Sequence, residues 1–179
     1  MKRLTLYNIF KKNPKLFISG IFGLILVTVF LFVSVQSAIF LFLIVSEIIL
    51  ALVLGFFHLN KFGFELVTVT AVMGGVVYGP TTGLSLGIIL SIFHYLLSQS
   101  FGPYIFYSIP IFGAMGFLAG MFLGVNIVFL GIAISLVYNS ITTSLGVLST
   151  GNIAGELLWS GSNLAVNFIL FTQLVPLLI

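Results

Sequence analysis

The stretch that decides the fold class is AIFLFLIVSEIILALVLGFF, residues 38–57. Apart from Ser46 and Glu47 it is apolar or small throughout, and it has about the 20 residues that a helix needs to cross a bilayer core roughly 30 Å thick. A membrane-spanning strand would instead show short segments that alternate between apolar and polar residues. The stretch therefore predicts a transmembrane helix.

The rest of the chain has the same character. Of its 179 residues 60% are hydrophobic and 5% are charged, and the mean hydropathy is +1.34. A soluble domain is about one quarter charged, so polar residues this sparse could not cover a surface in water. Backbone groups in lipid need partners within the protein, which favours helices. We expect an all-α integral membrane protein, a compact bundle of six to seven transmembrane helices.

Polar residues, glycines and prolines divide the chain into segments. Residues 1–15 are expected to form a basic interfacial segment, and residues 16–179 a single transmembrane domain. The expected spans cover about 16–34, 38–57, 64–79, 81–99, 104–124, 126–148 and 159–178. A polar loop that includes Glu156 is expected to precede the last span.

Five of the six basic residues precede the first expected span: Lys2, Arg3, Lys11, Lys12 and Lys15. Such a cluster could contact nucleic acid, but beside a membrane span it is typical of a cytoplasmic anchor. We therefore expect a multi-pass protein of the plasma membrane with a cytoplasmic N-terminus, whose partner is the lipid bilayer and not a nucleic acid.

Glycines recur at helical spacing in two ladders, Gly75, Gly79, Gly83 and Gly87 in the first, Gly113, Gly116, Gly120 and Gly124 in the second. Pro80 interrupts the first ladder, so we expect two helices that meet at a tight Gly79–Pro80 turn. Small residues let membrane helices approach closely. The ladders either pack the bundle's own helices or form a docking surface for another membrane subunit.

Two acidic residues fall within or beside expected spans. Glu47 lies in the middle of a span, where a charge is costly unless it has a partner or contacts water. It could be protonated, hydrogen-bonded to a neighbouring helix, or part of a substrate or ion site. Glu65 lies at the start of a span, where the helix dipole favours a carboxylate.

Other polar residues also lie within the expected spans. His94 shares a small, polar helix face with Gly87 and Ser91, which is typical of a hydrogen-bonded packing residue. Asn163 and Asn167 are one turn apart and, with Asn139, should point toward protein or water and not toward lipid. Trp159 fits either the interfacial aromatic belt or a stacking surface for a ring-shaped ligand.

Motifs for catalysis and cofactor binding are missing from the sequence. There is no phosphate-binding glycine loop with a lysine, no HExxH, no GxSxG, no aspartate and no cysteine. Two distant histidines do not make a metal centre. We expect a protein that is not an enzyme and has no catalytic residue, no metal and no cofactor.

The runs ELVTVT (65–70) and GGVVYGPTTGLSLG (74–87) carry a family resemblance. The second contains G-x-x-x-G-P-x-x-G-x-x-x-G, and it resembles the second and third helices of the substrate-binding S-components of energy-coupling factor (ECF) transporters. A looser resemblance to the family extends over about residues 38–178. Members of that family are six-helix membrane proteins that capture a vitamin or a metal ion and dock on a transmembrane coupling subunit driven by two ATPases.

The resemblance implies a substrate-capture subunit for a micronutrient, a vitamin-like small molecule. Docking through small residues of the family's first helix would correspond to Ala51 and Gly55. The ligand-gating loop would correspond to residues 58–64. Together with the polar and aromatic residues above, this predicts a set of substrate-binding residues: Asn60, Lys61, Glu65, Thr68, His94, Asn139, Trp159, Asn163 and Asn167.

One departure from the family pattern and one further similarity leave alternatives open. A span at 16–34 would precede the family's six helices and invert their orientation, so either this segment does not cross the membrane or the resemblance is one of fold alone. The chain is also similar in size and glycine content to MreD, a bacterial cell-shape protein, although MreD's membrane aspartates are missing. The alternative function is thus a non-transporting membrane scaffold or assembly subunit that packs through glycine-rich faces.

Overall fold

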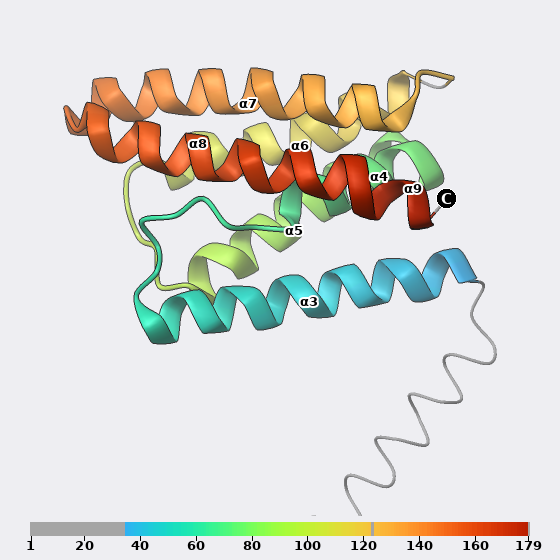
Figure 1. The fold of residues 1–179 in the computed structure, drawn as a ribbon, viewed down its shortest axis with the longest axis horizontal. Coiled ribbons are helices and arrows are strands. Elements are labelled where there is room, and N and C mark those ends of the chain that lie inside the picture. Colours follow the sequence, from blue (N-terminus) through green and yellow to red (C-terminus); the bar gives the residue numbers. More distant parts are fainter. Residues whose placement is uncertain (1–34, 123, 179) are drawn as a thin grey trace, which may run out of the picture. The chain divides into compact units, whose positions relative to one another are not determined.

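The computed structural model describes residues 35–122 and 124–178, and every regular element in these ranges is helical (Figure 1). The all-helical prediction is confirmed for this part of the chain. The expected basic segment 1–15 and the expected span 16–34 lie outside the described residues. The described elements are α3 (Val35–Phe57), α4 (Val67–Tyr78), α5 (Pro80–Leu97), α6 (Ile105–Met121), α7 (Ile127–Thr150) and α8 (Ile153–Ile169), which continues through a π-helical turn, η1 (Leu170–Leu174), into α9 (Val175–Leu178).

Four of the described helical segments are long and apolar enough to cross a membrane: Ser37–Phe57, Pro80–Leu97, Ile127–Thr150 and Ile153–Leu178. α4 and α6 are apolar but shorter. With 12 residues, α4 is about 18 Å long at 1.5 Å per residue, well short of a bilayer core. The described part therefore contains six helices, counting α8, η1 and α9 as one, and four of them are long enough to span a membrane. Six to seven transmembrane helices were expected for the whole chain.

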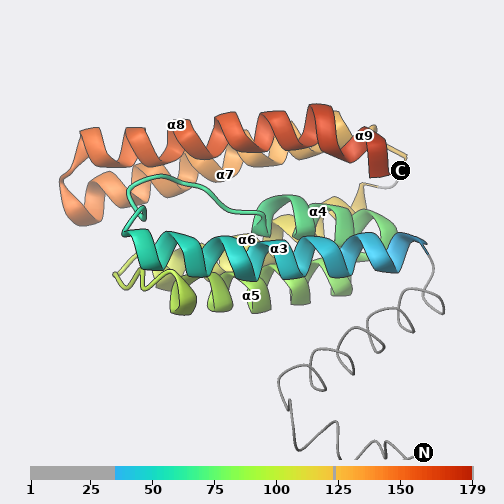
Figure 2. The ribbon, with the colours of Figure 1, turned by 60° about the horizontal axis from the view of Figure 1, so that its bottom comes forward.

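The expected span 64–79 was wrong at its start, because residues 58–66 are not helical and α4 begins at Val67. Figures 1 and 2 show this α3–α4 connection, residues 58–66, running from the end of α3 back toward the middle of the bundle, where α4 starts. Its backbone groups are bound by side chains of other helices, as described below. These tertiary hydrogen bonds replace the helical ones that the sequence pattern led us to expect.

The Gly79–Pro80 turn is present as predicted. Gly79 has a φ of 95°, a left-handed conformation that glycine adopts without strain, and Pro80 is the first residue of α5. Most glycines of the two ladders bring α4, α5 and α6 into backbone contact, whereas Gly79 and Gly124 have open space at their Cβ positions. A Cβ atom added at Gly75 or at Gly83 would collide with the carbonyl oxygen of Gly116. These glycines therefore pack the bundle's own helices, the first of the two interpretations above.

The last long helix begins earlier than predicted. Gly151 ends α7 in a left-handed conformation, and the side chain of Asn152 then accepts a hydrogen bond from the Gly155 N–H and caps α8. Glu156 consequently lies in the first turn of α8 and not in a loop, and Trp159 lies within the helix. Little in the sequence marks this start, because Gly155 and Glu156 interrupt the apolar pattern in the first turn, and the cap depends on a single asparagine.

Candidate functional site

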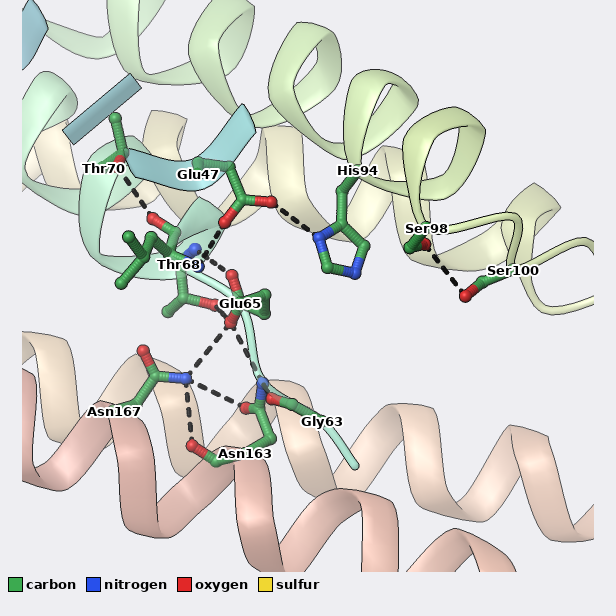
Figure 3. Close-up of polar contacts among 11 residues, drawn as sticks. Glu47, Gly63, Glu65, Thr68, Thr70, His94, Ser98, Ser100, Asn163 and Asn167 are labelled. Atoms are coloured by element: carbon green, nitrogen blue, oxygen red, sulfur yellow. Dashed lines mark hydrogen bonds and ion pairs between the residues drawn. The ribbon is translucent and has the colours of Figure 1, made fainter. Parts of the chain in front are cut away.

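A buried polar cluster surrounds Glu65, which is 1% exposed and directly precedes the first turn of α4 (Figure 3). Its Oε2 accepts the Thr68 N–H at 2.7 Å, and its Oε1 accepts the Thr68 hydroxyl at 2.6 Å. From α8, the side-chain amides of Asn163 and Asn167 also donate to Oε1, at 3.0 and 3.2 Å. Glu65 thus satisfies the free N–H at the start of α4 and ties α4 to α8.

The three asparagines join α7, α8 and the α3–α4 connection. Asn139 of α7 and Asn167 of α8 both donate to the Oδ1 of Asn163, at 2.8 and 3.0 Å. Asn163 donates in turn to the Gly63 carbonyl at 2.8 Å. All three side chains are at most 1% exposed. The asparagines point toward protein, and each contributes to a single hydrogen-bonded network.

Glu47 of α3 forms the other half of this polar interior. Its Oε2 accepts the Leu66 N–H at 2.6 Å, and its Oε1 lies 2.6 Å from Nδ1 of His94 on α5 (Figure 3). Of the alternatives left open by the sequence, a bond to a neighbouring helix is the one observed. Glu47 therefore has two partners, which offset the cost of placing a carboxyl group in an apolar interior.

A partly open cavity of about 440 Å³ lies beside this interior, at the end of the bundle where α3, α5 and α7 end and α6 and α8 begin. We call this the cavity end. The lining residues come from every one of these elements and from the α3–α4 connection: Leu54, Asn60, Lys61, Phe62, His94, Tyr95, Ser100, Tyr104, Tyr107, Ser108, Thr142, Asn152, Gly155, Glu156, Leu158 and Trp159.

The expected substrate-binding residues divide into two groups. Asn60, Lys61, His94 and Trp159 line the cavity. The other five belong to the buried polar cluster and do not line it: Glu65, Thr68, Asn139, Asn163 and Asn167. His94 connects the groups, because it lines the cavity and also binds Glu47.

Sequence reasoning missed the aromatic wall of the cavity and its acidic residue. Tyr95, Tyr104 and Tyr107 line the cavity, but tyrosines in an apolar helix carry no distinctive pattern. Glu156 was interpreted as a solvated loop residue, although it lies three residues before Trp159 on one face of α8. Recognising Asn152 as a helix cap would have revealed this pairing.

Ala51 and Gly55 do not form an exposed docking surface. Ala51 is fully buried, and a Cβ at Gly55 would collide with the carbonyl oxygen of Leu97 on α5. Both residues lie on the inner face of α3, which the bundle already occupies. The prediction that a partner docks through Ala51 and Gly55 is therefore corrected, because Ala51 is buried and Gly55 packs against α5.

Among residues 35–122 and 124–178, no three histidine or acidic side chains gather as a metal site would require. The chain matches no protein-family model, no curated protein and no solved structure. The cavity and the contacts that shape it are therefore the features from which a function can be inferred.

Proposed function

We propose that this chain is a membrane-embedded capture subunit of an uptake transporter, which binds a vitamin-like small molecule in the cavity and passes it on by docking on an ATPase-driven coupling subunit. The observation that carries the proposal is the cavity itself. Its volume of about 440 Å³ is within the usual range for small-molecule sites, and its lining combines aromatic rings with polar and charged side chains.

One of these polar groups is an acceptor without a partner. The side-chain amide nitrogen of Asn60 donates to the Ser98 carbonyl at 2.7 Å, whereas its Oδ1 is buried and accepts no hydrogen bond. A buried acceptor is costly to leave unpaired. The hydrogen bond to Ser98 fixes the amide group of Asn60 at the end of α5.

The cavity wall formed by Asn60, Lys61 and Phe62 is held in place without being helical. Three hydrogen bonds hold the α3–α4 connection in place. They join the Asn60 amide to the Ser98 carbonyl, the Gly63 N–H to the Ser162 hydroxyl at 2.8 Å, and the Leu66 N–H to Glu47. A wall that is already ordered loses little conformational entropy when a ligand binds. The arrangement supports capture of a ligand at this end of the bundle.

The scaffold alternative gains no support from the described residues. It was motivated by glycine faces that a second protein could approach. The glycines of α4, α5 and α6 already contact one another within the bundle, so these faces are filled. We therefore retain small-molecule capture as the single proposal.

Filling the cavity should abolish ligand capture. Thr142 lines the cavity, and its hydroxyl donates to the Tyr138 carbonyl of its own helix, so Thr142→Phe adds volume without breaking a bond between helices. The wild-type protein, purified from its native membranes in mild detergent, should retain a small molecule that mass spectrometry detects after denaturation. The Thr142→Phe protein should retain less than about one tenth of that amount, because a phenyl ring would occupy the binding space.

Ser140→Phe is the matched control. Ser140 lies on the same helix, makes the same kind of bond to the Leu136 carbonyl, and is exposed on the outside of the bundle. This variant should retain the molecule as the wild type does. The proposal fails if purified wild-type protein carries no small molecule and no ATPase subunits accompany it, or if Thr142→Phe retains as much ligand as Ser140→Phe.

A further inference from the structure

We infer that the cavity recognises a small organic cation, whose positive charge lies between the first turns of α6 and α8. This inference rests on the proposed function, because it names the class of molecule that the same cavity would take. It is carried by one carboxylate and three aromatic rings that two helices present to the same space: Glu156, Trp159, Tyr104 and Tyr107.

The spacing of these residues places them in facing pairs. Glu156 and Trp159 are three residues apart in α8, and Tyr104 and Tyr107 are three residues apart at the start of α6, so each pair occupies one helix face. All four line the cavity. The charge of Glu156 also acts electrostatically on both tyrosines. One carboxylate and three aromatic rings from two helices therefore line the same cavity.

The rings are held by neighbours that do not depend on a ligand. Trp159 packs edge-on against buried Tyr138, with ring centroids 6.1 Å apart. Tyr104 packs against buried Tyr95, with centroids 5.7 Å apart. Aromatic faces carry partial negative charge and attract organic cations, most strongly when several rings surround the charge. The cavity lining provides three such rings, two of which pack against buried neighbours.

Glu156 has no basic partner among the described residues. The ion pair found in that part of the chain joins His94 and Glu47. The hydrogen bond that Glu156 accepts comes from the Thr150 hydroxyl, at a long 3.3 Å. The absence of a side chain at Gly146 makes room for the carboxyl group, because a Cβ there would collide with Glu156 Oε2. A carboxylate is thus held at the cavity with its charge unneutralised.

A simple role at the start of the helix does not account for Glu156. Asn152 already caps α8 by accepting the Gly155 N–H at 3.0 Å, and the backbone N–H of Glu156 itself donates to the Asn152 carbonyl at 3.1 Å. The carboxylate therefore accepts no backbone N–H of the first turn. It is directed instead toward α7 and the cavity lining.

Lys61 is the opposite charge of the cavity and must be considered. It lies on the α3–α4 connection and is exposed to solvent, which screens its charge. Glu156 is less exposed and lies among aromatic rings. The charge of Glu156 is therefore screened less than that of Lys61, which supplies a matched variant of opposite sign.

Three pyridines of nearly the same shape but different charge test the inference: 1-methylnicotinamide is a cation, nicotinamide is neutral and nicotinate is an anion. Trp159 is the single tryptophan of the chain, so its emission reports binding in the cavity directly. The full chain, purified in detergent, is titrated with each probe, and N-acetyltryptophanamide in the same detergent corrects for collisional quenching. We expect saturable binding of 1-methylnicotinamide with a Kd about tenfold lower than that of nicotinamide, and weaker still for nicotinate.

Variants assign the effect to the carboxylate. Glu156→Gln keeps the shape and removes the charge, and it should raise the Kd of 1-methylnicotinamide about tenfold while leaving that of nicotinamide unchanged. Gly146→Ala keeps the charge but displaces the carboxyl group, so it should also weaken cation binding. Lys61→Gln removes the positive charge of the cavity lining and should tighten cation binding. Thermal melting checks that each variant is folded. If Glu156→Gln does not fold, cation binding by Gly146→Ala tests the role of the carboxylate instead.

Each outcome has a definite meaning. Equal or tighter binding of nicotinamide or nicotinate overturns the cation inference but leaves small-molecule capture standing, because the cavity still binds. A Glu156→Gln protein that binds 1-methylnicotinamide as the wild type does overturns it too. If no probe binds saturably, the cation inference is overturned, and the capture proposal is then decided separately by the molecule retained from native membranes.

Discussion

At the scale of single residues, one carboxyl group links two parts of the site. Glu47 is fully buried, and it binds both His94 of the cavity wall and the backbone N–H of Leu66, where the α3–α4 connection meets α4. A change at His94 therefore reaches the connection through a single side chain. The same geometry makes Glu47 costly to remove, because the Leu66 N–H and Nδ1 of His94 would lose their hydrogen-bond partner inside the protein.

Replacing Glu47 by leucine should reduce the free energy of unfolding by about 3 kcal/mol, because it leaves one partner of a buried pair and a buried N–H unpaired. His94→Leu should also destabilise, and the double variant should lose less than the sum of the two single losses. Unfolding in sodium dodecyl sulfate, followed by Trp159 emission, measures all three. Strictly additive losses would contradict a direct Glu47–His94 interaction.

Part of the candidate site was predictable at this scale. Asn60 and Lys61 were predicted from the resemblance of residues 58–64 to a ligand-gating loop. His94 and Trp159 were predicted because a polar or indole group in an apolar sequence stands out. Asn163 and Asn167 were identified for the same reason, yet their amide groups are used inside the bundle by Glu65. Sequence shows that such a side chain needs a partner, but only tertiary packing shows whether that partner is protein or ligand.

At the scale of elements, backbone contact among α4, α5 and α6 sets the centre of the bundle. Gly83 and Gly116 each leave no room for a Cβ because the other's carbonyl oxygen is there. Apolar side chains gain little by meeting in lipid, so close approach of backbones supplies much of the attraction. Packing of this kind tolerates almost no added atoms.

Gly116→Ala should therefore destabilise the protein by about 1–3 kcal/mol, because α5 and α6 would have to separate. Gly161→Ala is the counterpart. Gly161 lies in α8 with open space around its Cβ position, so alanine should be neutral or stabilise the helix by up to about 1 kcal/mol. Detergent unfolding curves of both variants compare them directly. Equal destabilisation by the two substitutions would argue against the α5–α6 contact.

Helices were easier to predict than their ends. Continuous apolar runs and the Gly79–Pro80 turn located the elements, because these features act locally. The start of α4 was missed since Glu47, Ser162 and Asn163 hold the preceding backbone in a non-helical form. These residues are far away in the sequence, and no local pattern reports their contacts.

At the scale of the whole bundle, the cavity opens at one end only of the described helices. Lys61 lies at this cavity end, and Thr81, in the first turn of α5, is exposed at the other. Capture of a nutrient requires the cavity end to face the outside of the cell. The positive-inside interpretation of residues 1–15, combined with a crossing at 16–34, would place it inside.

The chain has no cysteine, so single cysteines can report its orientation. In intact cells, a membrane-impermeant maleimide should label Lys61→Cys, whereas Thr81→Cys should be labelled only after the membrane is opened. Both side chains are exposed, which makes the pair comparable. The reverse pattern would place the cavity in the cytoplasm and exclude capture from outside.

The shortness of α4 has a consequence for how the protein is made. Its 12 residues cannot cross a bilayer alone, and its buried start depends on Asn163 and Asn167, which are synthesised about 100 residues after Glu65. During synthesis, Glu65 therefore lacks these two hydrogen-bond donors until α8 has been made. The interior is completed only when α8 has been made, so a chain that stops before Asn163 would lack the side-chain amides that bind Glu65.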